Sequence, residues 1–289
     1  MKIYQKFRPI TATPSRCTDE YVEIAPCEEL RPFIRCFWGS RHPILSSSAR
    51  AAGGNIVIPD TCADIIFAVH NEEHSIESSF CGICDQTFFS PSLYGGERMT
   101  SVFGVRFYAW SVVLFSDENM KGAKNCYCDA GVFFEQMKRE MENILYEQEQ
   151  IGQRVLIAQK YLLKRLKLQR ENSLFMRAIS KIVEENGNRR VLELATDLHI
   201  SSRQMERVFE TNMGVTPKKA IDLIRYQSLW QEVYANKAFN ILDAVYKYGY
   251  TDQAHLLNDF RKKHGISLKE AVTYAEDVAY LQESADILM

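Results

Sequence analysis

The sequence has no apolar run long enough to cross a membrane. A membrane-spanning helix needs about 18 or more consecutive apolar residues, and no such run occurs among the 289 residues. The opening Met1–Lys6 carries two lysines and no apolar core of the signal-peptide type. We therefore expect a cytoplasmic protein with no membrane partner.

Short motifs of the common enzyme classes are also missing. No P-loop, dinucleotide fingerprint or Gly-x-Ser-x-Gly elbow occurs, and none of the six histidines forms a His-x-His pair. His70 and His74 flank a polar stretch that is typical of a turn. A metal-dependent enzyme normally needs clustered histidine and carboxylate ligands. The sequence therefore predicts no enzyme activity and no cofactor.

There is no overall excess of positive charge, because the formal net charge is −2. Nucleic-acid binders usually show a basic surface. The charge is nevertheless uneven: between Arg189 and Lys269, thirteen lysines and arginines stand against nine acidic residues, whereas five acids and no base follow from Glu270 onward. The basic excess in the first of these segments favours nucleic-acid binding there.

No cysteine occurs after residue 128, although eight cysteines lie at or before that point. Cys81-x-x-Cys84 and Cys126-x-Cys128 are candidates for a zinc site or a thiol switch, because paired thiolates bind zinc or oxidise. The second pair is one residue too close for a zinc-ribbon knuckle, and reduced cytosolic cysteines usually pack as small apolar residues. The sequence favours reduced, structural cysteines, with the metal or redox role as the alternative.

The segment Gly249–Phe260 shows the plan of two helices joined by a tight turn. Gly249 suits the left-handed residue that ends a helix, and Asp252 can cap the next one. Leu256 and Phe260 then lie four residues apart on one helix face, while polar residues occupy the others. This arrangement is typical of a helix-turn-helix, whose second helix lies in a DNA major groove.

The same pattern occurs about fifty residues earlier in the chain, after Val191–Ala195. In this earlier copy, the residues that correspond to Asp252, Leu256, Phe260 and Gly265 are Ser201, Met205, Phe209 and Gly214. Between the copies, Thr216-Pro217 begins a helix with proline at its first position. The sequence therefore predicts two helix-turn-helix units that one stiff helix holds apart.

Residues from about Leu174 to Val272 resemble the DNA-binding domain of AraC/XylS-type transcription regulators. The resemblance is carried by Leu194-Ala195, Ser201, Met205, Arg207, Phe209, Gly214, Thr216-Pro217, Arg225, Gly249-Tyr250, Asp252-Gln253, Phe260, Arg261-Lys262 and Gly265. The sequence departs from the family pattern at three positions: Asn258 stands where arginine is usual, Val245 where alanine is usual, and Leu268 where proline is usual. The resemblance implies DNA contacts at Ser202, Arg203, Glu206, Arg207, Gln253, Ala254, His255, Asn258, Arg261 and Lys262.

The first 130 residues have the rhythm of a β-domain. Short β-branched and aromatic runs occur at Asn55–Pro59, Asp64–Val69, Ser79–Ile83, Thr87–Phe89 and Ser101–Tyr108, with expected bends at Gly53-Gly54 and Gly95-Gly96. Many short strands at this spacing predict a β-sandwich or barrel.

Three motifs in this part resemble the cupin-like sensor domain found in one group of AraC-type regulators. They are Cys36-Phe37-Trp38, Ile58-Pro59-Asp60 with Asp64-Ile65-Ile66, and Gly104-Val105-Arg106-Phe107. Such a barrel could hold a small molecule, and the candidate lining is Trp38, Asp64, Phe67, Arg106 and Tyr108. The alternative is that Arg106 and Asp64 form a structural or surface ion pair, with Trp38 in the core.

Between these two parts, residues 131–168 show helical periodicity. The apolar positions are Phe133, Met137, Met141, Ile144 and Leu145, then, after a break near Gly152, Val155, Tyr161, Leu162 and Leu166. This helical pair could serve as a dimerisation element or pack on the barrel. The basic run Lys160–Arg170 and the following Glu171–Ser173 are typical of a linker.

The sequence as a whole predicts an α+β protein with two domains. A cupin-like β-barrel or sandwich at 1–130 is followed by a helical connector at 131–170 and an all-α double helix-turn-helix domain at 171–289. The function that follows is sequence-specific transcription regulation, with activation expected, on double-stranded DNA and under a small-molecule effector. RNA polymerase and a second copy of the chain are further partners that the resemblance allows. A redox- or metal-responsive regulator and a cupin-like metalloenzyme are the alternatives.

Overall fold

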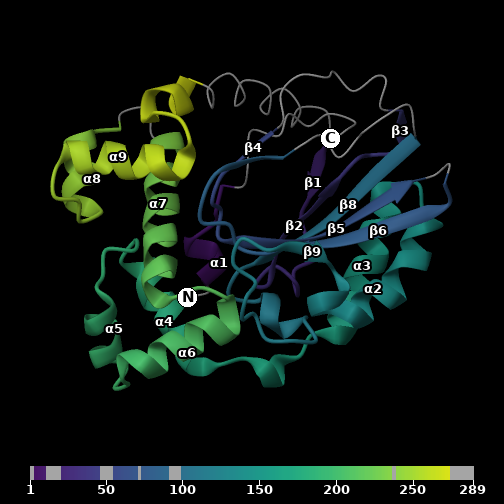
Figure 1. The fold of residues 1–289 in the computed structure, drawn as a ribbon, viewed down its shortest axis with the longest axis horizontal. Coiled ribbons are helices and arrows are strands. Elements are labelled where there is room, and N and C mark those ends of the chain that lie inside the picture. Colours follow the sequence, from purple (N-terminus) through teal and green to yellow (C-terminus); the bar gives the residue numbers. More distant parts are fainter. Residues whose placement is uncertain are drawn as a thin grey trace.

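The chain folds into an N-terminal β-sheet domain and a C-terminal helical region (Figure 1). This computed structural model describes residues 3–10, 21–45, 55–70, 73–90, 99–235 and 239–273. No helix in those residues is long and apolar enough to span a membrane. The expected bends at Gly53-Gly54 and Gly95-Gly96 lie outside the described residues.

In the described residues of the N-terminal domain, seven strands form a large antiparallel sheet in the order β1-β2-β8-β5-β6-β9, with β3 paired to β8. A separate two-stranded sheet joins β4 to β7. The strands are β1 Val22–Ile24, β2 Ile34–Gly39, β3 Ile44–Leu45, β4 Asn55–Val57, β5 Cys62–His70, β6 Ser75–Cys81, β7 Phe88–Ser90, β8 Met99–Tyr108 and β9 Tyr127–Asp129.

Strand positions agree with the alternating apolar runs, with shifts at their ends. Of the run expected at Ser79–Ile83, only Ser79–Cys81 is strand, and it forms the end of β6, which begins at Ser75. This strand starts early because every residue from Ser75 to Cys81 pairs with β5. The run expected at Thr87–Phe89 is β7 at Phe88–Ser90.

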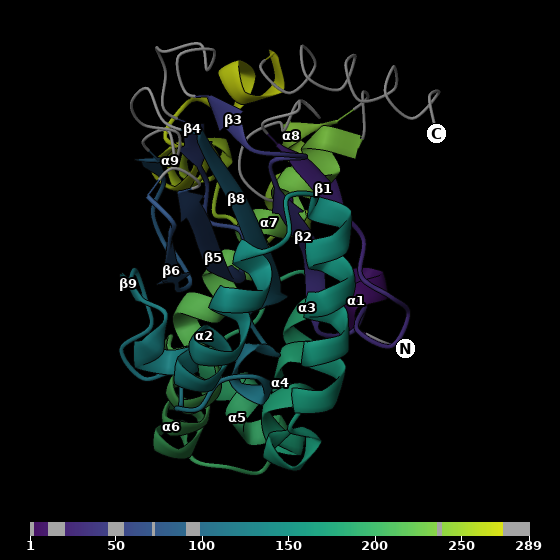
Figure 2. The same ribbon diagram turned by 90° about the vertical axis from the view of Figure 1, so that its right-hand side faces the viewer.

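Two helices, α2 (Gly131–Tyr146) and α3 (Ile151–Arg165), cover one face of the large sheet (Figure 2). Their buried side chains pack into one core with strand residues such as Phe80 and Phe107. The prediction of a helical pair was therefore correct, and the pair packs on the sheet. Ile144, one of its expected apolar positions, is 43% exposed.

The boundaries of this helical pair differ from the prediction. The break lies at residues 147–150, and Gly152 stands inside the first turn of α3. Lys160–Arg165, expected in a linker, continue α3, and the connection to the next long helix runs through the short η3 at Leu168–Arg170. The basic run was misread because Tyr161 and Leu162 continue the apolar face of the helix through it.

The C-terminal region consists of helices around one long central helix, α7. Their bounds are α4 Ser173–Glu184, α5 Val191–Asp197, α6 Ser202–Met213, α7 Pro217–Ala235, α8 Ile241–Lys247 and α9 Gln253–His264. The pairs α5–α6 and α8–α9 lie at opposite ends of α7 (Figure 1). Pro217 is the first residue of α7, as predicted, and the Thr216 hydroxyl oxygen accepts a hydrogen bond from Lys219 N at 3.3 Å.

The two helix pairs are built alike at their ends. Ser201 accepts a hydrogen bond from the backbone N–H of the third residue after it, Gln204, and Asp252 does the same for His255. Before each cap the chain passes through a left-handed residue, His199 in the first pair and Gly249 in the second. The predicted caps and turn are thus confirmed.

The two parts of the molecule share packed side chains. Tyr108 and Trp110 at the end of β8 belong to the same apolar cluster as Phe175 of α4 and Phe209 of α6. Ile58 packs in a cluster with Tyr226 and other side chains around α7 and α9. The helical region is consequently held against the sheet domain at more than one place.

Two neighbouring serines test the importance of the α6 cap. Ser201→Ala removes the side-chain acceptor at the start of α6 and should lower the free energy of unfolding by about 0.5–2 kcal/mol. Ser202→Ala makes the same chemical change at the exposed first residue of the helix and should change stability by less than about 0.5 kcal/mol. Urea denaturation of both variants measures the difference; equal losses would contradict the capping role.

Candidate nucleic-acid interface and buried ion cluster

Helix α6 is fixed on one side and open on the other. Met205 and Phe209 are fully buried, and Phe209 meets the ring of Phe175 edge-on, with 5.2 Å between ring centroids. The opposite side is exposed and polar. It carries four of the predicted DNA-contact residues, Ser202, Arg203, Glu206 and Arg207.

Helix α9 repeats this construction. Leu256 and Phe260 are fully buried. The predicted DNA-contact residues on this helix are all exposed, and they are Gln253, Ala254, His255, Asn258, Arg261 and Lys262. Leu257, on the same helix, is half-buried and packs against the cluster around Trp230.

A polar network that the sequence did not reveal holds α9 in place. The Tyr250 hydroxyl donates to Asp259 Oδ2 at 2.8 Å, and Asp259 also pairs with Lys263 one turn later. The guanidinium of Arg225, from α7, lies 4.9 Å from the centre of the Tyr250 ring. No local sequence pattern predicts this network, because Arg225, Tyr250 and Asp259 lie far apart in the sequence.

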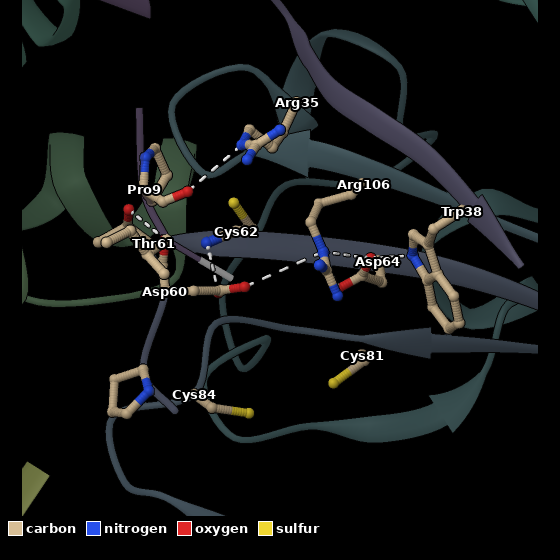
Figure 3. A network of polar contacts seen from close by, with 12 residues as sticks. Pro9, Arg35, Trp38, Asp60, Thr61, Cys62, Asp64, Cys81, Cys84 and Arg106 are labelled. Carbon is tan, nitrogen blue, oxygen red and sulfur yellow. Dashed lines mark hydrogen bonds and ion pairs between the residues drawn. The ribbon is translucent and has the colours of Figure 1, made fainter. Parts of the chain in front are cut away.

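On the large sheet, the face opposite α2 and α3 carries a buried ion cluster, which we call the Arg106 cluster: Arg106, Asp64, Asp60 and Glu23. Arg106 Nε donates to Asp64 at 2.9 Å, and the indole N–H of Trp38 donates to the same carboxylate oxygen at 2.7 Å. Figure 3 shows the guanidinium between Asp60 and Asp64. Arg106 and Asp64 face each other directly because they are register partners on β8 and β5.

Close packing around Trp38 depends on a glycine. Gly104 is the register partner of Trp38 on the neighbouring strand. A Cβ at this position would overlap the indole ring. The ring in turn stacks on Tyr21, at 5.7 Å between centroids, and lies 5.5 Å from the Arg106 guanidinium.

The predicted pocket lining is only partly brought together. Trp38, Asp64 and Arg106 meet, and the Arg106–Asp64 ion pair beside a buried Trp38 is the arrangement that the alternative interpretation expected. Phe67 was wrongly included: it lies three residues from Asp64 on one strand, so its side chain points to the opposite face and into the core under α2 and α3. Tyr108 shares the Arg106 face but stacks on Trp110, at 4.4 Å, beside the helical region.

Sequence reasoning missed Asp60 and Glu23 as members of the cluster. Asp60 Oδ2 lies 3.9 Å from Arg106 Nε, and Glu23 Oε1 lies 3.9 Å from Arg106 Nη1. The Ile-Pro-Asp motif could have pointed to Asp60. Glu23 had no sequence signal, because only the pairing of β1 with β2 brings it beside Trp38.

Burial governs the electrostatics of this cluster. Burial alone would lower the pKa of the Arg106 guanidinium. Asp64 and other neighbouring groups raise it by more, so the net pKa lies well above its ordinary value and Arg106 stays charged. Burial also raises the pKa of Asp60 to about 6, against a smaller opposing effect of Arg106. Arg106 Nη1 is buried and has no hydrogen-bond acceptor among the described residues. In the described ranges of the chain, the cluster therefore holds a charged guanidinium whose Nη1 makes no hydrogen bond.

The two cysteine pairs do not converge on one site. Cys81 is the register partner of Asp64, whereas Cys128 is the partner of Phe80, the residue before Cys81. Adjacent strand residues point to opposite faces, so the pairs lie on opposite sides of the sheet. Within the part of the chain that the structure describes, no group of three or more His, Cys, Asp or Glu residues could hold a metal ion.

Comparisons with known proteins follow the same division of the chain. Residues 194–273 match the family model described as a helix-turn-helix domain, and residues 22–129 match a domain of unknown function, DUF6597. No curated protein sequence matches the chain significantly. A sheet domain followed by a helix-turn-helix domain defines this protein as a DNA-binding transcription regulator. Residues 194–273 are a helix-turn-helix domain of the AraC type.

Solved structures of ToxT from Vibrio cholerae show a distant likeness. The apo form of a ToxT variant is 15% identical, with 83% of this chain and 97% of that chain covered and a TM-score of 0.37. Wild-type ToxT bound to an unsaturated fatty acid is 12% identical, with coverages of 82% and 94% and a TM-score of 0.37.

The raised pKa of Asp60 predicts a pH-dependent contribution to stability. As the pH rises from about 4 to about 6, the unfolded chain ionises this carboxyl before the folded protein does, so stability is lost over that range. Asp60→Asn keeps the acceptor for Cys62 N but cannot ionise. The stability of the wild type relative to this variant should therefore fall by up to about 3 kcal/mol from pH 4 to pH 7. Urea denaturation across this range measures it, and a constant difference would contradict the assignment.

Proposed function

We propose that the protein is an effector-responsive regulator that reads two DNA boxes, one with α6 and one with α9. The observation that carries this proposal is the common construction of the two helix pairs at opposite ends of α7. Each second helix has a side-chain cap, two buried anchors and an exposed polar side. Such helices suit two major-groove segments about one helical turn apart, or roughly 10 bp.

The exposed side chains have the chemistry for reading bases. Arg203 and Arg207 can each present two donors to O6 and N7 of guanine, which is a strong and specific contact. Gln253 and Asn258 can pair with adenine but reach less far. Glu206, Ala254 and His255 complete the base-facing candidates. Ser202, Arg261 and Lys262 suit phosphate contacts, which position the protein without reading sequence.

We further propose that the N-terminal domain is cupin-like and binds a small-molecule effector at the Arg106 cluster. Support comes from the buried Arg106 Nη1 donor that has no acceptor among the described residues. A buried donor without a partner costs free energy, and a ligand oxygen placed there would recover it. On this proposal the protein binds and does not catalyse. RNA polymerase and a second copy of the chain are proposed partners on the strength of the AraC-type domain alone.

The two-box proposal predicts a local effect of Arg207→Ala. If Arg207 contacts a base, the variant should lose about 1–3 kcal/mol of binding free energy and relax base preference in one box only. Arg139→Ala, at an exposed arginine of α2 outside both helix pairs, is the matched control and should leave preference unchanged. Binding to a set of single-base operator variants measures both.

Two results would contradict the two-box proposal. One is a loss of affinity in Arg207→Ala that is equal for all sequences and reduces the salt slope by about one, because a phosphate contact behaves in this way. The other is unchanged binding after roughly five base pairs are inserted between the boxes, since this turns one box to the opposite face of the DNA.

The effector proposal predicts that replacement of Arg106 and replacement of the cysteines have different effects on stabilisation by a ligand. In a thermal-shift screen of small molecules, a compound at 100 times its Kd should stabilise the wild type by about 2.7 kcal/mol. Arg106→Gln should abolish this stabilisation, whereas replacement of Cys81, Cys84, Cys126 and Cys128 by serine should retain it. Loss of the response in the cysteine variant, together with near-stoichiometric zinc or oxidant sensitivity in the wild type, would favour the thiol or metal alternative.

A further inference from the structure

The N-terminal domain contacts the last turn of α6. The backbone N–H of Met120 donates to the carbonyl oxygen of Thr211 at 2.9 Å. Gly214, the left-handed residue that ends the helix, fits closely under the same segment: a Cβ there would lie 2.5 Å from Met120 O. The contact is therefore made by backbone on both sides.

An equivalent contact is made at the end of α9. The Thr87 hydroxyl donates to the carbonyl oxygen of Lys263, in the last turn of this helix. Gly265, again the left-handed residue that ends the helix, lies against the Thr87 methyl group, which would be 3.1 Å from a Cβ. Gly214 and Gly265 occupy the same position in the two helix pairs, so the N-terminal domain contacts both helices at corresponding ends.

The chemistry of helix ends explains why these contacts form. The last four carbonyl groups of an α-helix have no partner within the helix. Met120 and Thr87 supply donors to one such group on each helix. The predicted base-reading residues of α6 and α9 remain exposed in this arrangement. The N-terminal domain thus fixes the helices without covering their DNA-contact residues.

The middle of α7 is held as well. The fully buried Gln227 side chain donates to the carbonyls of Pro59 at 2.6 Å and Ile10 at 3.1 Å, and it accepts from Ile10 N at 2.9 Å. Pro59 directly precedes Asp60 of the Arg106 cluster. Near the start of α7, Lys219 pairs with Asp85 at 3.0 Å, two residues before Thr87.

We propose that Thr87, Met120 and Gln227 are positioning residues that set the relative placement of α6 and α9, and thereby the spacing between the DNA boxes that the protein accepts. This inference rests on the proposed two-box reading. It adds that the N-terminal domain acts on spacing, and not by blocking the DNA-contact residues. Pro59, which accepts a hydrogen bond from Gln227 of α7, directly precedes Asp60, so the Arg106 cluster is connected to α7 through adjacent residues.

Selection from a pool of random-sequence DNA duplexes tests the proposal with the full-length chain. The wild type should select two motifs at one narrow spacing. Thr87→Val should select the same two motifs over a broader range, and discrimination against a spacing one base pair longer should fall by about three- to tenfold, as expected for one lost hydrogen bond. Thr273→Val is the matched control, because the Thr273 hydroxyl also donates to a lysine carbonyl, that of Lys269, but within its own segment.

A second pair of variants tests the α6 contact. Gly214→Ala introduces a side chain against Met120 O, and Gly122→Ala introduces the same side chain at another left-handed glycine with open space around it. Both carry similar backbone strain, but only Gly214→Ala should broaden the spacing. Hydrogen exchange of the His264 and Gly265 amides should also quicken in Thr87→Val and stay unchanged in Thr273→Val.

The outcomes separate this inference from the proposed function. Selection of a single motif by the wild type would refute the two-box reading itself. Two motifs at a narrow spacing in the wild type, with the same narrow spacing in Thr87→Val and Gly214→Ala, would overturn the positioning role alone. Equal broadening in the variants and in their controls would also overturn it, since general destabilisation would then account for the effect.

Discussion

The structure depends above all on satisfying the unpaired backbone groups at the ends of α6 and α9. Ser201 and Asp252 accept hydrogen bonds from the first turns of α6 and α9. Met120 and Thr87, from a different domain, donate to the last turns. The caps at the helix starts come from neighbouring residues, so the sequence around each helix determines where it starts. The donors at the helix ends come from the N-terminal domain, so each helix ends against that domain.

The Arg106 cluster depends on the pairing of buried charges. Each charge in it loses hydration, and only close pairing offsets this loss. The carboxylate of Asp64 accepts from both Arg106 and Trp38, whereas Asp60 lies farther away and has a raised pKa. Such a cluster is sensitive to any added charge or acceptor, which is the property that an effector site requires.

The sequence predicted local features well and partners across strands less well. The caps, the left-handed turn and the start of α7 at Pro217 follow from neighbouring residues, so they could be read directly. Phe67 was misplaced, although its spacing from Asp64 put it on the other face of the strand. Glu23 was missed because strand pairing, and not spacing, brings it to Arg106.

By itself, the sequence determined the two capped helix pairs, the stiff helix between them and the resemblance to AraC-type regulators, because helix starts, turns and apolar faces depend on residues within a few positions of each other. Only the tertiary structure decided how the sheet domain meets those helices. Thr87 and Lys263 are 176 positions apart, and Gln227 and Pro59 are 168 apart. No short-range pattern carries such pairings, since they arise when two separately folded surfaces pack and their remaining donors and acceptors find one another.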